Sequence, residues 1–354
     1  MRVIDRYIAT QVVINTLLVL LVLTALASLI TFVGEFGHVG QGKYTLLDAA
    51  TYTLLYVPST AYSMFVVAAF LGAMLGLGEL ASHNELMVMR TAGLSVARLG
   101  LSMLTGGVVL LAVCVVLGEF VAPVAQRHAE SMRSELIYNQ PALIGNGGIW
   151  AKDGDVFLNI RQMSKRNSAQ GIYIYRIDSS HQLLSSTEAA SAVFNNGVWL
   201  LKGLHETRLT PDGATTRNVP SEAWHTYLGP GLLSLFVVDT DSLSARGLYQ
   251  YIEYLRSNGI NADRYVTAFW SRAAQPLSLL VMMLLVLPFV FGPFRSATTG
   301  QRLVAGMLIG VVFSVFDNIF MQSGLVFGFN PMLTAWLPTL LLAAICGVAV
   351  SRIR

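Results

Sequence analysis

Long apolar stretches alternate with short polar ones along most of this chain. A helix that crosses a bilayer needs about 20 mainly apolar residues, and runs of that length predict membrane-spanning helices. The runs are Val12–Val33, Tyr52–Leu77, Leu99–Val121, Ala268–Phe291, Leu303–Phe320 and Met332–Val350. The sequence therefore predicts an α-helical integral membrane protein with six transmembrane helices.

A long polar segment, roughly residues 126–264, separates the third predicted span from the fourth and has the texture of a β-domain. Its strand-like stretches are rich in β-branched and aromatic residues and bounded by Gly, Asn and Asp. They include Asp155–Met163, Gly171–Asp178 and Gly197–Gly203. Several strands at this spacing favour a sandwich or an open jelly roll. In Ser244–Gly259, Leu248, Ile252 and Leu255 recur at helical intervals, which predicts a connecting helix back to the membrane.

The predicted layout thus has three parts. Residues 1–125 carry three spans and a cytoplasmic helix at about 82–93, residues 126–264 form the β-domain, and residues 265–354 carry three further spans.

Positive charges in the short loops predict the orientation, because cytoplasmic loops carry an excess of Arg and Lys. With the N-terminus inside, the short outer loops hold only Lys43. The cytoplasmic segments then hold Arg2, Arg6, Arg90, Arg98, Arg295, Arg302, Arg352 and Arg354. Both termini are expected in the cytoplasm, and the β-domain on the outer side.

Composition agrees with a membrane protein and excludes other classes. Hydrophobic residues make up 54% of the chain and charged residues 12%, whereas a soluble domain carries about 25% charged residues. A net charge of +3 is too small to indicate nucleic-acid binding. Cys114 and Cys346 both lie in apolar runs, so neither a disulfide framework nor a zinc cluster is expected.

Motifs for chemistry are missing from the sequence. It contains no Gly-x-x-x-x-Gly-Lys-Ser/Thr phosphate-binding loop, no Gly-x-Ser-x-Gly and no His-Glu-x-x-His, and no two of its six histidines stand four residues apart. We therefore expect no catalytic residue, no metal site and no cofactor in this chain, and do not expect it to be an enzyme.

The polar stretch Glu79–Ser95 (ELASHNELMVMRTAGLS) lies on the predicted cytoplasmic side, between the second and third spans. Ser82 and Glu85 fit a capping box, and Gly93 suits a helix C-terminus. Leu86, Met89 and Gly93 share one face, while Glu85 and Arg90 project at the ends or sides. The stretch is either a surface helix resting on lipid headgroups or a docking helix for a partner's groove. Since the chain has no phosphate-binding loop of its own, the second interpretation indicates a separate ATPase.

Two further groups are candidates for lipid contact. Lys43, Arg127, His128 and Arg133 could present positive charge to an anionic headgroup, or be ordinary interfacial anchors. Asp317 and Asn318, late in the fifth span, could line a cavity or gate, or be buried against neighbouring helices.

Several stretches match a known family in order along nearly the whole chain. They are Asp5–Ile8 (DRYI), Gly40–Thr45, Glu85–Gly93 (ELMVMRTAG), Gly118–Pro123 (GEFVAP), Gly148–Gly154, Leu243–Leu255, Trp270–Ser278 and Phe291–Ser296 (FGPFRS). With them the chain resembles the LptF/LptG permeases of the lipopolysaccharide export system, and more closely the LptG branch.

The resemblance implies six transmembrane helices with a periplasmic β-jelly roll inserted between the third and fourth. In that family LptG pairs with LptF on two copies of the ATPase LptB, which binds ATP and Mg²⁺. The complex extracts lipopolysaccharide from the bacterial inner membrane and passes it to LptC and the periplasmic LptA bridge. The cytoplasmic helix after the second span is the coupling element, and its acidic residue aligns with Glu85. Glu85, Leu86, Met89, Arg90 and Gly93 are therefore the expected ATPase-coupling residues, and the first and fifth spans the expected gates.

One departure concerns the lipid contacts. Relatives carry lysines near the outer end of the first span, where this chain has Thr31, Gly37 and His38, with Lys43 a few residues on. The headgroup contacts therefore rest on the residues of this chain alone. Two alternatives remain open: another lipid or lipoprotein exporter permease, and a membrane-anchored scaffold whose β-domain binds periplasmic partners.

Overall fold

The computed structural model describes residues 3–138, 148–164, 167–178, 180, 182–195, 197–210, 213–226, 228–233, 240, 243–291 and 297–352. The predicted cytoplasmic arginines Arg2, Arg295 and Arg354 lie outside them. The chain divides into two compact units. One comprises Met1–Gly34, Thr53–Gln126 and Asp263–Arg354, and the other Glu35–Tyr52 and Arg127–Ala262.

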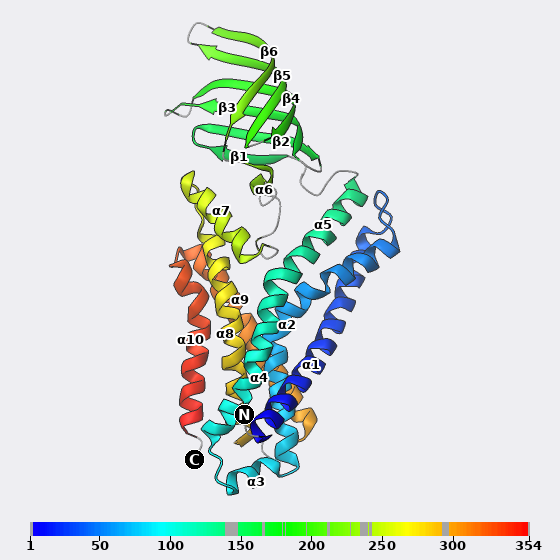
Figure 1. Ribbon diagram of the computed structural model, residues 1–354, viewed down its shortest axis with the longest axis vertical. Coiled ribbons are helices and arrows are strands. Elements are labelled where there is room, and N and C mark those ends of the chain that lie inside the picture. Colours follow the sequence, from blue (N-terminus) through cyan, green and yellow to red (C-terminus); the bar gives the residue numbers. More distant parts are fainter. Residues whose placement is uncertain are drawn as a thin grey trace. The chain divides into compact units, whose positions relative to one another are not determined.

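The six predicted spans are confirmed: among the described residues, six helices are long and apolar enough to cross a membrane. They begin with α1 (Val3–Glu35), α2 (Leu46–Ser82) and α4 (Val96–Val116), and end with α8 (Asp263–Phe291), α9 (Thr299–Phe327) and α10 (Pro331–Ser351). Figure 1 shows these helices. Most extend beyond the predicted apolar runs, because polar residues continue the helices past their apolar parts.

The first helix shows how this unit packs. Ile8, Val12 and Thr16 recur four residues apart on α1 and are fully buried. Opposite them, Gly72 of α2 leaves no room for a Cβ, which would clash with the Cα of Thr16. A Cβ on Gly106 of α4 would likewise lie only 2.9 Å from the carbonyl oxygen of Ala9. Small residues thus let the backbones approach, as is usual where lipid supplies no hydrophobic drive for helix association.

The third span does not stop at Val121 as predicted. A π-helical turn, η2 (Leu117–Val121), follows α4 and leads into α5 (Ala122–Tyr138). Such a turn disturbs the regular backbone hydrogen bonds, and Arg272 of α8 donates a hydrogen bond to the Gly118 carbonyl at 3.2 Å. The predicted boundary was wrong because a polar helix, invisible to a hydropathy argument, continues the apolar one.

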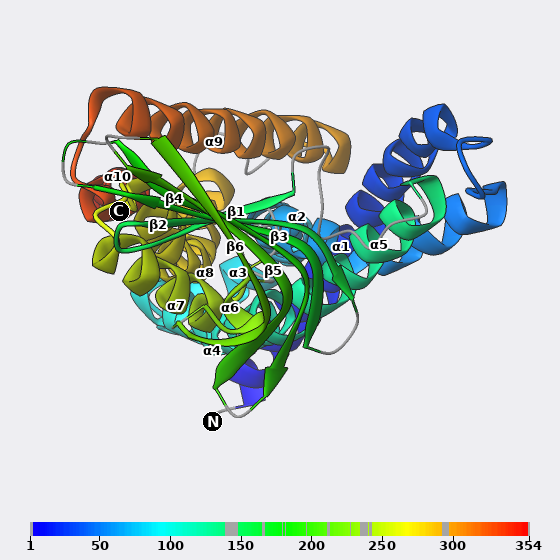
Figure 2. The same ribbon diagram turned by 90° about the horizontal axis from the view of Figure 1, so that it is seen from above.

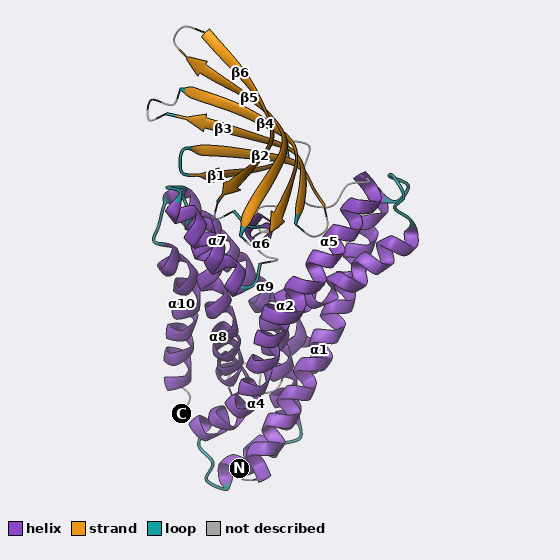
Figure 3. Cartoon of the chain, turned by 45° about the horizontal axis from the view of Figure 1, so that its top comes forward, coloured by secondary structure: helices purple, strands orange, loops and turns teal. Residues whose placement is uncertain are grey.

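The other unit carries the inserted β-domain. Its strands are β1 (Ile149–Asp153), β2 (Val156–Ser164), β3 (Ser168–Ile177), β4 (Leu183–Asn195), β5 (Val198–Thr210) and β6 (Gly213–His225). In the described residues they form one antiparallel sheet in the order β1 to β6, as Figure 3 shows. The expected jelly roll therefore takes the form of an open meander. Figure 2 shows the strand directions fanning out, as the right-handed twist of strands requires.

Helix α7 (Ala245–Ser257) confirms the predicted connecting helix. The Ser244 side chain caps it by accepting from the Gly247 N–H, and Leu248, Ile252 and Leu255 are buried. Tyr254 fixes the helix to β1, since its hydroxyl donates to the Lys152 carbonyl and accepts from the Lys152 N–H, both at 2.8 Å. The unit also holds the short helices η1 (Phe36–His38) and α6 (Pro230–Leu233).

Candidate functional site

The polar stretch between the second and third spans contains a separate helix, α3 (Glu85–Thr91), of seven residues. Asn84 precedes it in the left-handed conformation (φ 59°), a conformation that Asn adopts more readily than most residues. Gly93 follows it with φ 92°. The Leu94 N–H bonds to the Met89 carbonyl and the Gly93 N–H to the Arg90 carbonyl, which is a Schellman ending. The predicted stop at Gly93 is confirmed.

The predicted capping box is wrong. Ser82 is the last residue of α2, and its hydroxyl donates to the Glu79 carbonyl at 2.8 Å instead of capping α3. Asn84 occupies the N-cap position without a side-chain hydrogen bond. The prediction failed because α2 runs five residues past its apolar part, to Ser82, which places Ser82 inside the preceding helix. Glu85 is therefore not engaged in a cap.

Glu85 instead contacts the first helix. The Tyr7 hydroxyl of α1 donates a hydrogen bond to Glu85 Oε2 at 3.1 Å. One turn further along α1, Gln11 donates to a Glu79 oxygen on α2 at 2.6 Å. The carboxylates at both ends of the turn from α2 to α3 are thus held by α1.

The apolar face of α3 packs inward, which corrects the expectation that it faces a partner. Leu86 is 3% exposed and belongs to the apolar core of its unit, and Met89 packs against that core. The exposed side of α3 carries Met87, Val88 and Thr91 instead. Any partner would meet this side together with the helix ends.

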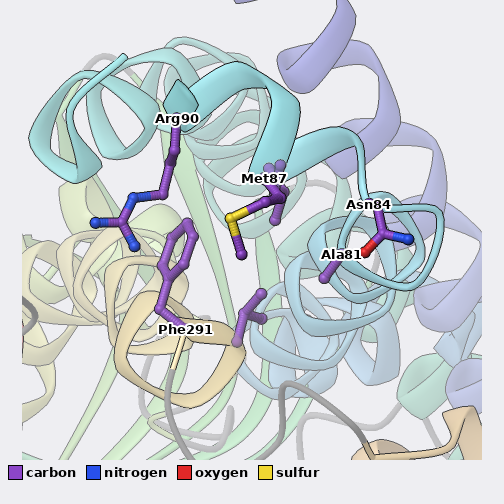
Figure 4. Close-up of a pocket in the computed structure, with 7 residues that line it drawn as sticks. Ala81, Asn84, Met87, Arg90 and Phe291 are labelled. Atoms are coloured by element: carbon purple, nitrogen blue, oxygen red, sulfur yellow. The ribbon is translucent and has the colours of Figure 1, made fainter. Parts of the chain in front are cut away.

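Arg90 and Met87 connect α3 to the end of α8. The Arg90 guanidinium lies 5.4 Å from the centre of the Phe291 ring, a cation–π distance. Figure 4 shows the Arg90 and Met87 side chains reaching from α3 towards Phe291. The small cavity between them has a volume of about 40 Å³ and is also lined by Ala81, Asn84, Leu86 and Val290. It has room for little more than a water molecule, so this site is a packing contact between helices and not a ligand pocket.

A second polar contact holds the start of α1 on α4. Asp5 is 7% exposed, and it accepts hydrogen bonds from the Arg98 guanidinium at 2.8 Å and the Ser102 hydroxyl at 2.5 Å. A buried carboxylate requires such partners to offset its lost hydration. The first turns of α1 are therefore bonded to α2, α3 and α4.

Of the predicted lipid-contact residues, Arg133 already has an anionic partner. Its guanidinium donates to Glu35 Oε1 at 2.9 Å and lies 4.6 Å from the Tyr52 ring centre. The Tyr44 hydroxyl donates to the other Glu35 oxygen at 2.9 Å. Burial, followed by this hydrogen bond, raises the pKa of Tyr44, so it remains a donor at neutral pH. The Arg133 guanidinium is thus already paired with the buried Glu35 carboxylate.

Lys43, Arg127 and His128 are exposed and belong to the same unit as Arg133. The Lys43 N–H bonds to the Leu136 carbonyl at 2.8 Å, which holds the loop after α1 against α5. Asp317 and Asn318 lie on α9 in the other unit. Asp317 is half-buried, and exposed Asn318 donates to the Ser314 carbonyl of its own helix. In the described part of the chain, no three His, Cys, Asp or Glu side chains cluster as metal ligands would.

Sequence reasoning missed Tyr7, Phe291 and Glu35 as parts of these sites. Tyr7 lies in the quoted DRYI stretch, and Phe291 begins the quoted FGPFRS stretch. Their roles depend on contacts between helices that are distant in sequence. Glu35 carried a usable signal, since a carboxylate at the end of an apolar run needs a partner or water.

Comparison with known proteins gives a consistent result. Residues 6–352 match the family described as "Lipopolysaccharide export system permease LptF/LptG". The chain is 39% identical over 340 residues to the lipopolysaccharide export system permease protein LptG of Escherichia coli strain K12, covering 95% of this chain and 94% of that protein. It is 34% identical over 352 residues to the protein of that name from Haemophilus influenzae, covering 99% and 98%.

Proposed function

Because the chain belongs to the LptF/LptG family of lipopolysaccharide export permeases, we propose that it moves lipopolysaccharide by coupling to a separate ATPase through α3. The ATPase would be an LptB dimer, which binds ATP and Mg²⁺, and this chain would hold no cofactor of its own. The other partners would be LptF as the second permease, LptC, and the periplasmic LptA bridge. The protein would lie in the bacterial inner membrane with both termini in the cytoplasm and the sheet in the periplasm.

The observation that carries this proposal is the double attachment of α3. At its start, Glu85 is bonded to Tyr7 of α1, and at its end, Arg90 lies over Phe291 of α8. Leu86 fixes the helix to the core of the unit between these contacts. A force applied to the exposed side of α3 would therefore reach two membrane helices at once. A surface helix that only rested on lipid would need neither contact.

The chain also has features that suit a lipid path. Helices α1 and α9 expose large apolar side chains along much of their length, including Leu21 at 70%, Ile30 at 74% and Val312 at 66%. In the proposed role these helices are the gates, and the headgroup meets Lys43, Arg127 and His128, with Arg133 as a contact already balanced by Glu35. Asp317 and Asn318 would face the path from α9.

Purification of the complex from native membranes tests the proposal against the alternative of a periplasmic scaffold. We expect a stoichiometric ATPase and bound lipopolysaccharide to accompany the wild-type chain. A scaffold would bring down periplasmic proteins without either of them, and that result would overturn the proposal.

A further inference from the structure

Three of the polar side chains in the first three turns of α1 are each bonded to a different neighbouring element. Asp5 is bonded to α4, Tyr7 to α3 and Gln11 to α2. We call these three residues the α1 clamp. They lie on one helix but are bonded to different elements, so we expect the loss of each bond to affect transport differently.

Tyr7 is the member of the α1 clamp that reaches the proposed contact helix. Its partner Glu85 is half-buried, and its own side chain is 43% exposed, so the pair lies at an accessible surface. Tyr7 bonds to Glu85 Oε2 alone. Within the described residues the second oxygen, Oε1, accepts no hydrogen bond. A carboxylate has two oxygens and can accept from two sides at once.

This geometry lets Glu85 act as a bridge between α1 and a partner. Because no cap occupies the carboxylate, Oε2 can hold α1 while Oε1 meets a donor from outside the chain. From this we propose that Tyr7 is a positioning residue for export: it passes a displacement of α3, imposed through Glu85, to the start of α1. This inference rests on the proposed function and adds the route by which α3 acts on the first membrane helix.

The surrounding contacts make α1 able to respond as one body. Ile8 and Val12 are fully buried on the same side of the helix, and Gly106 of α4 lies against the Ala9 carbonyl oxygen. A displacement of Tyr7 would therefore move the packed helix as a whole, and not only its first residues. Gln11, one turn further along, is bonded to α2, so the loss of its hydrogen bond does not break the link between α1 and α3.

The test uses the whole complex in proteoliposomes, with lipopolysaccharide in the membrane and ATP outside. Two rates are measured for each variant: ATP hydrolysis and the appearance of lipopolysaccharide on a periplasmic acceptor. Tyr7→Phe removes only the hydroxyl and keeps the ring. We expect it to lower the lipopolysaccharide moved per ATP about three- to tenfold, the effect of losing one exposed hydrogen bond of ordinary strength, while ATP hydrolysis stays near the wild-type rate.

Gln11→Met is the matched control, because it removes a similar exposed bond from the same helix to a different element. It should leave the ratio of lipid moved to ATP hydrolysed unchanged. The double variant Tyr7→Phe, Glu85→Ala should be no worse than Glu85→Ala alone, since both remove the same link.

Three results would contradict the relay. A wild-type ratio in Tyr7→Phe, with a lowered one in Glu85→Ala, overturns the role of Tyr7 and leaves the proposed function standing. Equal losses in Tyr7→Phe and Gln11→Met show general loosening of α1 and also overturn it. A wild-type ratio in Glu85→Ala contradicts the coupling role of α3 itself.

Discussion

At the scale of single residues, local chemistry was predictable and distant partners were not. Gly93 was predicted to end α3 because the left-handed turn it makes is decided within a few residues. The partner of Glu85 was not predicted, because Tyr7 lies 78 positions away in sequence and meets it only when α1 packs beside α3. The capping box failed for a related reason, since the helix boundary at Ser82 depends on polar residues that carry no apolar pattern.

The Asp5 contact yields a prediction about stability. Asp5→Ala removes the carboxylate partner of the partly exposed Arg98 guanidinium and leaves the buried Ser102 hydroxyl with only the Arg98 carbonyl as acceptor. We expect a loss of about 1–3 kcal/mol, the usual cost of hydrogen bonds to a charged group, measured as earlier thermal loss of the monodisperse protein in detergent. Arg208→Ala, which removes an exposed pair with Glu206 at 3.4 Å, should change it by less than about 0.5 kcal/mol. Equal stability of Asp5→Ala and wild type would show that the contacts of Asp5 with Arg98 and Ser102 do not stabilise the fold.

Gly93 yields a prediction about the order of α3. Its φ of 92° strains any residue with a Cβ, so Gly93→Ala should cost about 1–2 kcal/mol at the end of that helix. We expect faster amide hydrogen exchange across α3, and less lipid moved per ATP, with exchange in α7 unchanged. Gly34→Ala serves as the control, because a Cβ at that helical position meets nothing within 4 Å. Unchanged exchange in α3 would mean that the Schellman ending does not decide its stability.

At the scale of elements, the sequence predicted which segments are helices but not how they pack. The length of an apolar run identifies a span. The close approach of α1 to α2 and α4 depends instead on glycines of α2 and α4 that lie directly opposite α1. Gly72 and Gly106 sit inside long apolar runs where no local pattern marks them. Arg302 shows the same limit: predicted as a cytoplasmic loop charge, it is 3% exposed and donates to the Gly78 carbonyl of α2.

The crossing of α1 and α2 gives a prediction for Gly72. Its Cβ would meet backbone atoms of Thr16, which cannot rotate away as a side chain can. Gly72→Val should therefore push α1 off α2 and destabilise the unit by about 1–3 kcal/mol, as overpacking does. Thermal stability of the purified chain measures the loss, and a cysteine crosslink between the two helices measures the displacement. Gly300→Ala on α9, where nothing lies within 4 Å, is the control. A Gly72→Val protein with wild-type stability and crosslinking would refute the close crossing.

At the scale of the whole molecule, the order of parts was predictable because hydropathy and strand texture change abruptly along the chain. Three spans, an inserted sheet and three further spans follow directly from those changes. The meander order of the sheet did not, since strand order depends on pairing. The two compact units also do not coincide with the three consecutive parts predicted from the sequence, because Glu35–Tyr52 belongs to the same unit as the sheet. Its Glu35 accepts hydrogen bonds from both Tyr44 and Arg133, a set of contacts that no run of residues displays.

The measurement that tests the central claim most directly is ATP-dependent transfer of lipopolysaccharide from proteoliposomes that contain the complete complex to a periplasmic acceptor. With the wild-type chain we expect transfer that requires ATP, and with Glu85→Ala a loss of about tenfold or more, as expected when a contact to a charged group is removed. The complex must remain assembled in both cases, which size-exclusion chromatography verifies. Transfer by Glu85→Ala at the wild-type rate, or no ATP-dependent transfer with the wild-type chain, would contradict the account.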